Sequence, residues 1–303
     1  MSNHLRLEPS IRLVVERLAA ANLPPFESGT AEQARELSRR IRVLREPKPV
    51  RHVENVAVPG PVGSVPVRRH SQTDAPRAAI LYLHGGGWTL GSVDEADALT
   101  RELALTSNCE VYSVDYRLAP EAPFPAGLDD AEAVLTWLAK QTELPLIVMG
   151  DSAGANIATV IARRARDRGE ERIVLQILAY PVTDARMSGE SYVTFADGPL
   201  LSAPLMAWFW DQYLPDEAKR AHPDASPLRA NLAGMPPTFI LTAQNDVLRD
   251  EGKAYADALM TAGVPVTYKM YEGQIHGFLG MVGVSDGNAK AFQDISVVID
   301  EAA

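Results

Sequence analysis

The 303-residue chain has little of what several classes of protein require. It contains one cysteine, Cys109, so no disulfide can close within the chain and no pair of cysteines can hold a metal. No window approaches the roughly 20 apolar residues of a transmembrane helix, and the charged first 20 residues do not resemble a signal peptide. We therefore expect a cytoplasmic protein with no stable membrane insertion.

Positive charge is also scarce. The chain has 29 Lys and Arg residues against 39 Asp and Glu residues, a net charge of -10, which phosphate backbones repel. It lacks an H-x-x-x-H or His/Asp cluster for a metal and a G-x-G-x-x-G or Walker pattern for a nucleotide. The expected partner is thus a small molecule, with no nucleic acid, metal or cofactor.

What the chain does contain is a regular alternation of apolar segments. β-Branched runs predict about eight strands, and helical patterns separate most of the later ones. The strands are expected at 53–58, 64–70, 78–83, 109–114, 145–149, 173–179, 237–242 and 265–271, and the helices at 94–106, 126–140, 153–168, 248–262 and 288–301. The short turn Pro59-Gly60-Pro61 makes the first two strands antiparallel. The pattern predicts an α/β fold with a mostly parallel sheet flanked by helices.

Two further segments do not belong to this alternation. The N-terminal 50 residues show helical patterns, one from Ser10 and one from about Thr30 to Leu44. The interval 183–236 is too long for a simple crossover and contains an aromatic helical stretch, 204–214, so we expect an insertion over one end of the sheet. Its aromatic residues are typical of a packed helical layer, although one or two could line a pocket.

The strongest chemical signal is Gly150-Asp151-Ser152-Ala153-Gly154, a G-x-S-x-G pattern between a predicted strand and a predicted helix. That context is the one in which a tight turn exposes a nucleophilic serine. The N-terminus of the following helix adds N–H groups and a favourable dipole for an anion. Ser152 is therefore the candidate nucleophile.

A second signal is His84-Gly85-Gly86-Gly87-Trp88, directly after the strand 78–83. Three successive glycines allow backbone N–H groups to point into a cavity and bind an oxyanion. Gly85, Gly86 and Gly87 are therefore candidate oxyanion donors.

A serine nucleophile needs a histidine base and a carboxylate that orients it. In the order serine, acid, histidine, only His276 follows a late strand among the six histidines. Asp246 lies shortly after the strand 237–242 and is the preferred acid, with Asp250 as the second candidate.

With these residues in place, the chain resembles the hormone-sensitive-lipase-like serine esterases of the α/β-hydrolase superfamily, also called bacterial family IV. The resemblance covers about residues 78–282. Besides the motifs above, it rests on the stretches Asp115-Tyr116-Arg117-Leu118-Ala119-Pro120-Glu121, Phe124-Pro125-Ala126, Ser226-Pro227-Leu228, Asp246-Val247-Leu248-Arg249-Asp250 and His276-Gly277-Phe278. Two departures are Ala155, where a second glycine is usual, and Gln244, where an acidic residue is frequent.

The resemblance implies a Ser152, His276, Asp246 triad and an oxyanion hole formed by Gly85, Gly86 or Gly87 together with Ala153. It also implies a catalytic core of residues 51–182 and 221–303 under a helical cap made of residues 1–50 and 183–220.

The implied function is hydrolysis of short- to medium-chain acyl esters through an acyl-enzyme. Lactones and amides such as formamides stay open as alternative substrates, because one triad serves them all. A non-catalytic receptor on the same fold is the rival from another class. A homodimer is expected only by analogy.

Overall fold

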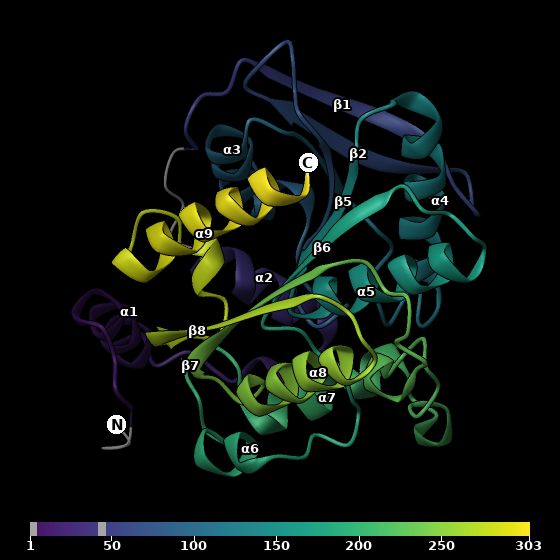
Figure 1. The fold of residues 1–303 in the computed structure, drawn as a ribbon. Helices are drawn as coiled ribbons and strands as arrows, with labels where there is room; N and C mark the ends of the chain where they lie inside the picture. The colour runs from purple at the N-terminus through teal and green to yellow at the C-terminus, as the bar shows by residue number, and fades with distance from the viewer. Residues whose placement is uncertain (1–4, 42–46) are drawn as a thin grey trace.

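The computed structural model describes residues 5–41 and 47–303 and places eight strands in one sheet. In chain order these are β1 (His52–Pro59), β2 (Ser64–Ser71), β3 (Ala79–Leu83), β4 (Glu110–Val114), β5 (Leu146–Asp151), β6 (Ile173–Ala179), β7 (Thr238–Asn245) and β8 (Val266–Ile275). The spatial order is β1-β2-β4-β3-β5-β6-β7-β8 (Figure 1). Strand β2 runs antiparallel to both of its neighbours, β1 and β4, and β3 to β8 run parallel to one another. The predicted eight-stranded, mostly parallel sheet is confirmed.

Helices cover both faces of this sheet. In chain order, the helices of the described residues are α1 (Pro9–Ala20), α2 (Ala31–Ile41), α3 (Val93–Ser107), α4 (Ala126–Gln141), α5 (Ala153–Asp167), α6 (Glu190–Thr194), α7 (Ala203–Tyr213), α8 (Arg249–Thr261) and α9 (Asp286–Ala302). Short 3-10 helices lie at Phe26–Ser28, Glu217–Lys219, Pro227–Arg229 and Phe278–Gly280. Helices α3 and α9 pack on one face, and α4, α5 and α8 on the other (Figure 1). The helix predicted from about Thr30 to Leu44 corresponds to α2, and the last three residues of the prediction lie outside the described part of the chain.

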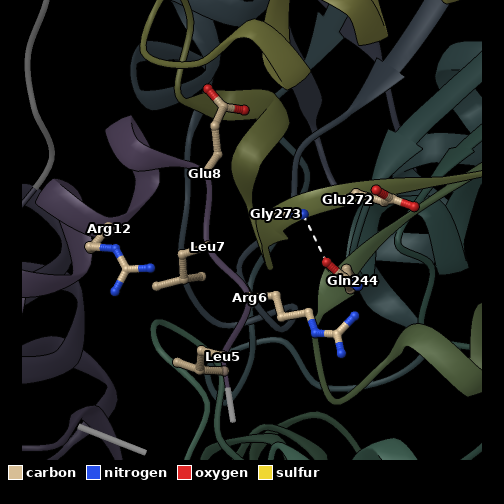
Figure 2. A pocket seen from close by; sticks show the side chains of 8 residues that line it. All are labelled: Leu5, Arg6, Leu7, Glu8, Arg12, Gln244, Glu272 and Gly273. Atoms are coloured by element: carbon tan, nitrogen blue, oxygen red, sulfur yellow. Dashed lines mark hydrogen bonds between the residues drawn. The ribbon is translucent and has the colours of Figure 1, made fainter. Parts of the chain in front are cut away.

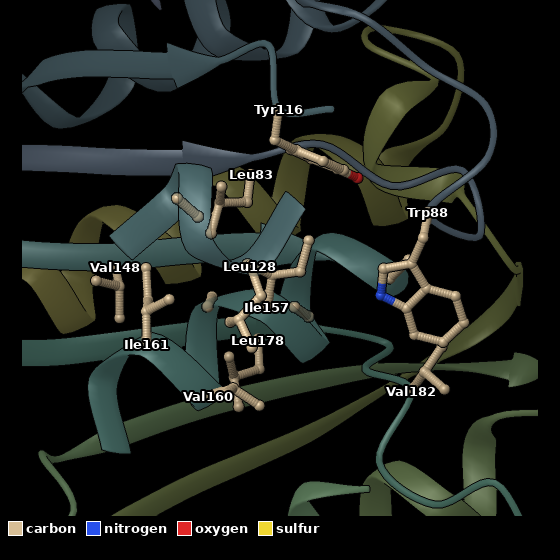
Figure 3. Close-up of a cluster of buried hydrophobic side chains, with 14 of the residues drawn as sticks. Leu83, Trp88, Tyr116, Leu128, Val148, Ile157, Val160, Ile161, Leu178 and Val182 are labelled. Carbon is tan, nitrogen blue, oxygen red and sulfur yellow. The ribbon is translucent and has the colours of Figure 1, made fainter. Parts of the chain in front are cut away.

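The alternation of side chains in β3 shows how the two layers form. Ile80 and Tyr82 join the core under α3 and α9, whereas Leu81 and Leu83 join the core under α4 and α5. Both sets are fully buried, as expected for a parallel strand covered on both faces. Each such apolar side chain stabilises the fold by about 1.5–3 kcal/mol. Figure 3 shows part of the second core, where Leu83 of β3 lies near the α5 residues Ile157 and Ile161.

The N-terminal helices are fastened to the body of the fold by polar contacts. The Arg35 guanidinium of α2 donates to the carbonyl oxygens of Thr89 and Ala119, each at 2.8 Å, and pairs with Glu121. Arg35 therefore connects α2 to the loops that follow β3 and β4.

The interval 183–236 packs on the same region through aromatic rings. The ring of Tyr213 in α7 stacks on Trp88 with centroids 4.2 Å apart, and Trp210 packs against the other side of that cluster. Both α7 residues are buried, as is Phe209, which agrees with the packed helical layer expected from the sequence. Over residues 5–41 and 47–303, no helix combines the length and the apolar character that crossing a membrane requires.

Candidate active site

Ser152 lies at a sharp turn between β5 and α5. Its backbone has φ 54° and ψ -119°, a strained conformation that non-glycine residues rarely adopt. Its N–H donates to the Ala179 carbonyl oxygen of β6 at 2.8 Å, which anchors the turn. The flanking glycines are sterically required, because a Cβ on Gly154 would lie 2.0 Å from the Leu83 carbonyl oxygen, and one on Gly150 would lie 2.3 Å from Gly154.

The structure brings Asp246 and His276 to this serine from the ends of β7 and β8. His276 Nδ1 lies 2.8 Å from Asp246 Oδ2, and His276 Nε2 lies 3.0 Å from Ser152 Oγ. Because a carboxylate can only accept, Nδ1 carries the proton, which leaves Nε2 to accept from the serine hydroxyl. Asp246 is 1% exposed and His276 is 9% exposed, so water competes little for these contacts.

The glycine-rich loop corrects one expectation from the sequence. The N–H of Gly85 donates to Asp151 Oδ1 at 2.9 Å, and the Tyr82 hydroxyl donates to the same oxygen at 2.6 Å. Gly85 is therefore not available as an oxyanion donor, because its amide already serves to hold the loop on Asp151.

The remaining candidate amides are those of Gly86, Gly87 and Ala153. Within the described ranges, none of these three N–H groups has an intramolecular acceptor. Ala153 is the first residue of α5, where a helix leaves its N–H groups unpaired. The site therefore combines three unpaired backbone donors with the serine.

The second candidate acid, Asp250, lies elsewhere. Its carboxylate accepts from the Ser191 N–H and the Arg249 guanidinium, each at 2.8 Å, and not from the histidine. Asp250 therefore fastens α6 to the start of α8, and Asp246 is the acid that contacts His276.

Several residues around the site are not signalled by any motif spacing. Asp151 lies inside the G-x-S-x-G motif, but the motif gives it no role. Its partner Gly85 is remote in the sequence, so no spacing predicts their hydrogen bond. Tyr180 packs beside His276 with ring centroids 4.8 Å apart. Burial raises the pKa of Tyr180 well above its usual value of 10, so its hydroxyl stays protonated and neutral at neutral pH.

The Asp115–Glu121 stretch fixes the backbone around the site. The Tyr116 hydroxyl donates to the His84 carbonyl oxygen at 2.7 Å, directly before the glycine-rich loop. The Arg117 side chain pairs with Asp130 of α4 through two donors at 2.8 Å. The first contact joins the loop after β4 to the loop after β3, and the second joins the loop after β4 to α4.

Comparison with known proteins shows the family and the fold. The family model described as alpha/beta hydrolase fold matches residues 80–280. Esterase LipI of Mycobacterium tuberculosis is 39% identical over 284 residues, which cover 88% of each chain. An ethyl acetate hydrolase of Pseudomonas putida is 41% identical over 212 residues, 67% of each chain.

A solved structure extends the likeness to the whole fold. The hyperthermophilic esterase from the archaeon Pyrobaculum calidifontis superposes with a TM-score of 0.92 at 37% identity, covering 97% of this chain and 98% of that one. The chain therefore belongs to the α/β-hydrolase fold family, within its hormone-sensitive-lipase-like group of carboxylic-ester hydrolases.

Proposed function

We propose that the chain hydrolyses carboxylic esters of short to medium acyl length through a Ser152, His276, Asp246 triad. The observation that carries this proposal is the unbroken line of contacts from Asp246 through His276 to Ser152 Oγ, at 2.8 and 3.0 Å. A relative named ethyl acetate hydrolase supports a small ester as the substrate.

In the first half of the proposed reaction, Ser152 Oγ attacks the ester carbonyl carbon while His276 Nε2 takes the hydroxyl proton. The N–H groups of Gly86, Gly87 and Ala153 stabilise the oxyanion, and the loss of one such donor costs about 3–4 kcal/mol. His276 then protonates the leaving alcohol, which departs and leaves an acyl-serine.

Water completes the cycle. His276 takes a proton from the incoming water, the resulting hydroxide attacks the acyl carbon, and Ser152 regains its proton as the acid leaves. Asp246 keeps the imidazole in the required tautomer and stabilises the imidazolium in both halves of the reaction.

We also propose that residues 1–50 and 183–220 form a cap over the core of residues 51–182 and 221–303. The packing of Phe209 supports this, because its ring lies so close to Gly87 that an added Cβ there would meet it at 2.1 Å. A ring at that position limits the space next to the oxyanion loop and so favours small acyl groups. The homodimer and the cytoplasmic location stay predictions.

The test is a panel of p-nitrophenyl esters of increasing acyl length, with a lactone and an anilide included. We expect the acetyl and butyryl esters to react fastest, and Ser152→Ala to lower kcat by about a millionfold. Ser107→Ala is the matched control, because Ser107 is also buried but lies in α3.

A fluorophosphonate probe separates the enzyme from a receptor. The wild type should be labelled at Ser152, and Ser152→Ala should not be labelled. Unlabelled wild type would favour a receptor, and faster cleavage of the lactone or anilide than of any ester would replace the proposed substrate class.

A further inference from the structure

A short N-terminal strap, residues 6–8, crosses the sheet where β7 and β8 end. Figure 2 shows this segment running past Gln244 of β7 and Gly273 of β8. The Arg6 N–H donates to Asn245 Oδ1 at 3.2 Å, and Asn245 Nδ2 donates back to the Arg6 carbonyl oxygen at 3.0 Å. The strap is thus joined to the residue that directly precedes Asp246.

Asn245 also reaches the neighbouring strand. Its Nδ2 donates to the Gln274 carbonyl oxygen at 3.0 Å, two residues before His276. Asn245 is 2% exposed, so these bonds are made away from water. One buried amide therefore links the strap to the segments that carry both the acid and the histidine.

Glu8 makes a second set of contacts to the histidine segment. Its N–H donates to the Gly273 carbonyl oxygen at 3.1 Å, and its Oε2 accepts from Gln274 Nε2 at 2.6 Å. The carboxylate also accepts from the N–H groups of Asp286 and Gly287, at 3.0 and 3.3 Å. Although burial raises it, the pKa of Glu8 is held below its usual range by the Ser10 hydroxyl, which donates to Oε1 at 2.8 Å, together with these donors, so the side chain is an anion at neutral pH.

The same network continues past the histidine. Gln274 Oε1 accepts from Ser285 Oγ at 3.0 Å, and Ser285 Oγ in turn accepts from the Asn288 N–H at 3.0 Å. Asn288 Nδ2 donates to the carbonyl oxygens of Phe278 and Leu279, at 3.0 and 2.9 Å. The backbone is therefore held on both sides of His276 by side chains that connect to Glu8.

The pairing of β7 with β8 is irregular just before Asp246 and His276. Pairing between β7 and β8 is regular up to Ala243 and Tyr271 and then shifts, so that Asn245 pairs with Ile275. Two residues of β7 thus span the same length as four residues of β8, so the backbone ladder is interrupted just before the single pair, Asn245 and Ile275, that precedes Asp246 and His276. The strap occupies the irregular stretch, where its own N–H and C=O groups pair with both strands.

Resting on the proposed function, we propose that the strap positions the Asp246–His276 pair, with Asn245 and Glu8 as its two positioning residues. Neither touches the reacting atoms. Each acts through the backbone that carries a catalytic side chain, and a displacement of about 1 Å at such a site costs about 100-fold in rate.

The test compares Asn245→Ala and Glu8→Ala with the wild type on p-nitrophenyl butyrate. We expect kcat to fall about 10- to 100-fold while KM stays within about twofold, because the acyl and alcohol pockets are not altered. The far-downfield proton resonance of His276 Nδ1–H should broaden or weaken in both variants, which loss of stability alone would not cause in the folded protein.

Two controls separate positioning from stability. Gln176→Ala removes another buried amide, bonded to Thr238 Oγ1 at 2.8 Å where β7 begins, and should lower the free energy of unfolding without changing kcat. Arg12→Ala changes an exposed residue beside the strap, in the same surface hollow, and should leave both unchanged.

An exchange of partners tests the Glu8 bond itself. Glu8→Gln should lower kcat, and adding Gln274→Glu should restore part of the loss, because the amide then donates from residue 8 to residue 274. Glu8 is only partly buried, so its variants decide the outcome if Asn245→Ala does not fold.

The strap proposal and the proposed function fail differently. If Ser152→Ala keeps full activity, the triad assignment is wrong whatever the strap variants do. If Ser152→Ala is inactive but the folded Asn245 and Glu8 variants keep kcat within about twofold, or lose it only as Gln176→Ala does, the strap proposal is wrong.

Discussion

Glu251 offers a direct test of how this fold handles a buried charge. It lies in α8, is 4% exposed, and its Oε1 accepts from the N–H groups of Thr183 and Asp184 at the start of the 183–220 segment. Its Oε2 accepts from the Tyr192 hydroxyl at 3.1 Å. Burial nevertheless outweighs these donors and raises the pKa of Glu251 from 4.5 to about 7.

The sign and size of the effect on stability follow from linkage. Between pH 4.5 and about 7 the native state holds a proton on Glu251 that the unfolded chain has lost, so raising the pH favours unfolding. At about 1.4 kcal/mol per pH unit, this one group lowers the free energy of unfolding by about 3 kcal/mol across that window. Below pH 4.5 and above about 7 its contribution is constant.

The assay is urea unfolding of the wild type and Glu251→Gln between pH 4 and 8, followed by the fluorescence of the buried Trp88 and Trp210. The stability of the wild type relative to the variant should fall by about 3 kcal/mol as the pH rises through the window. Glu190→Gln, at an exposed glutamate in α6, should show no such trend. A constant difference would show that the donors offset desolvation, and a difference that grows with pH would show that they outweigh it; either result would refute the reasoning.

Two further substitutions test the oxyanion loop and its support. Gly87→Ala places a Cβ 2.1 Å from the Phe209 ring at a φ of +58°, so we expect kcat for p-nitrophenyl acetate to fall about 100-fold. Adding Phe209→Ala should recover part of that loss, and an unchanged kcat in the single variant would contradict the packing. Arg117→Ala leaves the Asp130 carboxylate, 3% exposed, without its cation and should cost about 3 kcal/mol in urea unfolding. Adding Asp130→Asn should restore part of this stability, and a loss below about 1 kcal/mol in the single variant would mean that the pair is solvated.

The sheet could be predicted closely because its strands are buried on both faces and are therefore apolar throughout. The predicted strand 78–83 differs from β3 by one residue at its start. The ends of the last two strands were harder to predict, since the predicted strands 237–242 and 265–271 stop short of Asn245 and Ile275, where β7 and β8 end. The missing residues are mostly polar, such as Gln244 and Gln274, and they continue the strands through hydrogen bonds that no hydrophobic pattern records.

The candidate triad was equally readable, for a different reason. The order of serine, acid and histidine along the chain, each after its own strand, is set by the topology, and the structure brings Ser152, Asp246 and His276 within hydrogen-bonding distance. Gly85 was misassigned because three adjacent glycines look alike in the sequence. Only the folded chain shows that Asp151 accepts from the first amide, while the next two have no acceptor among residues 5–41 and 47–303.

What the sequence could not show is how the catalytic groups are held at the correct angle, and the physical reason is general. Parallel strands deliver residues to one edge of a sheet, but the ladder of backbone hydrogen bonds ends where the catalytic residues begin. Beyond that point, side chains from remote segments must fix the backbone, and Glu8 and Gln274 are 266 residues apart. Asp151 bonds the glycine-rich loop and Asn245 bonds the strap, in each case one residue before a member of the proposed triad. Both residues end their strands, where successive side chains point to opposite faces, so each can bond a remote segment beside a proposed catalytic residue.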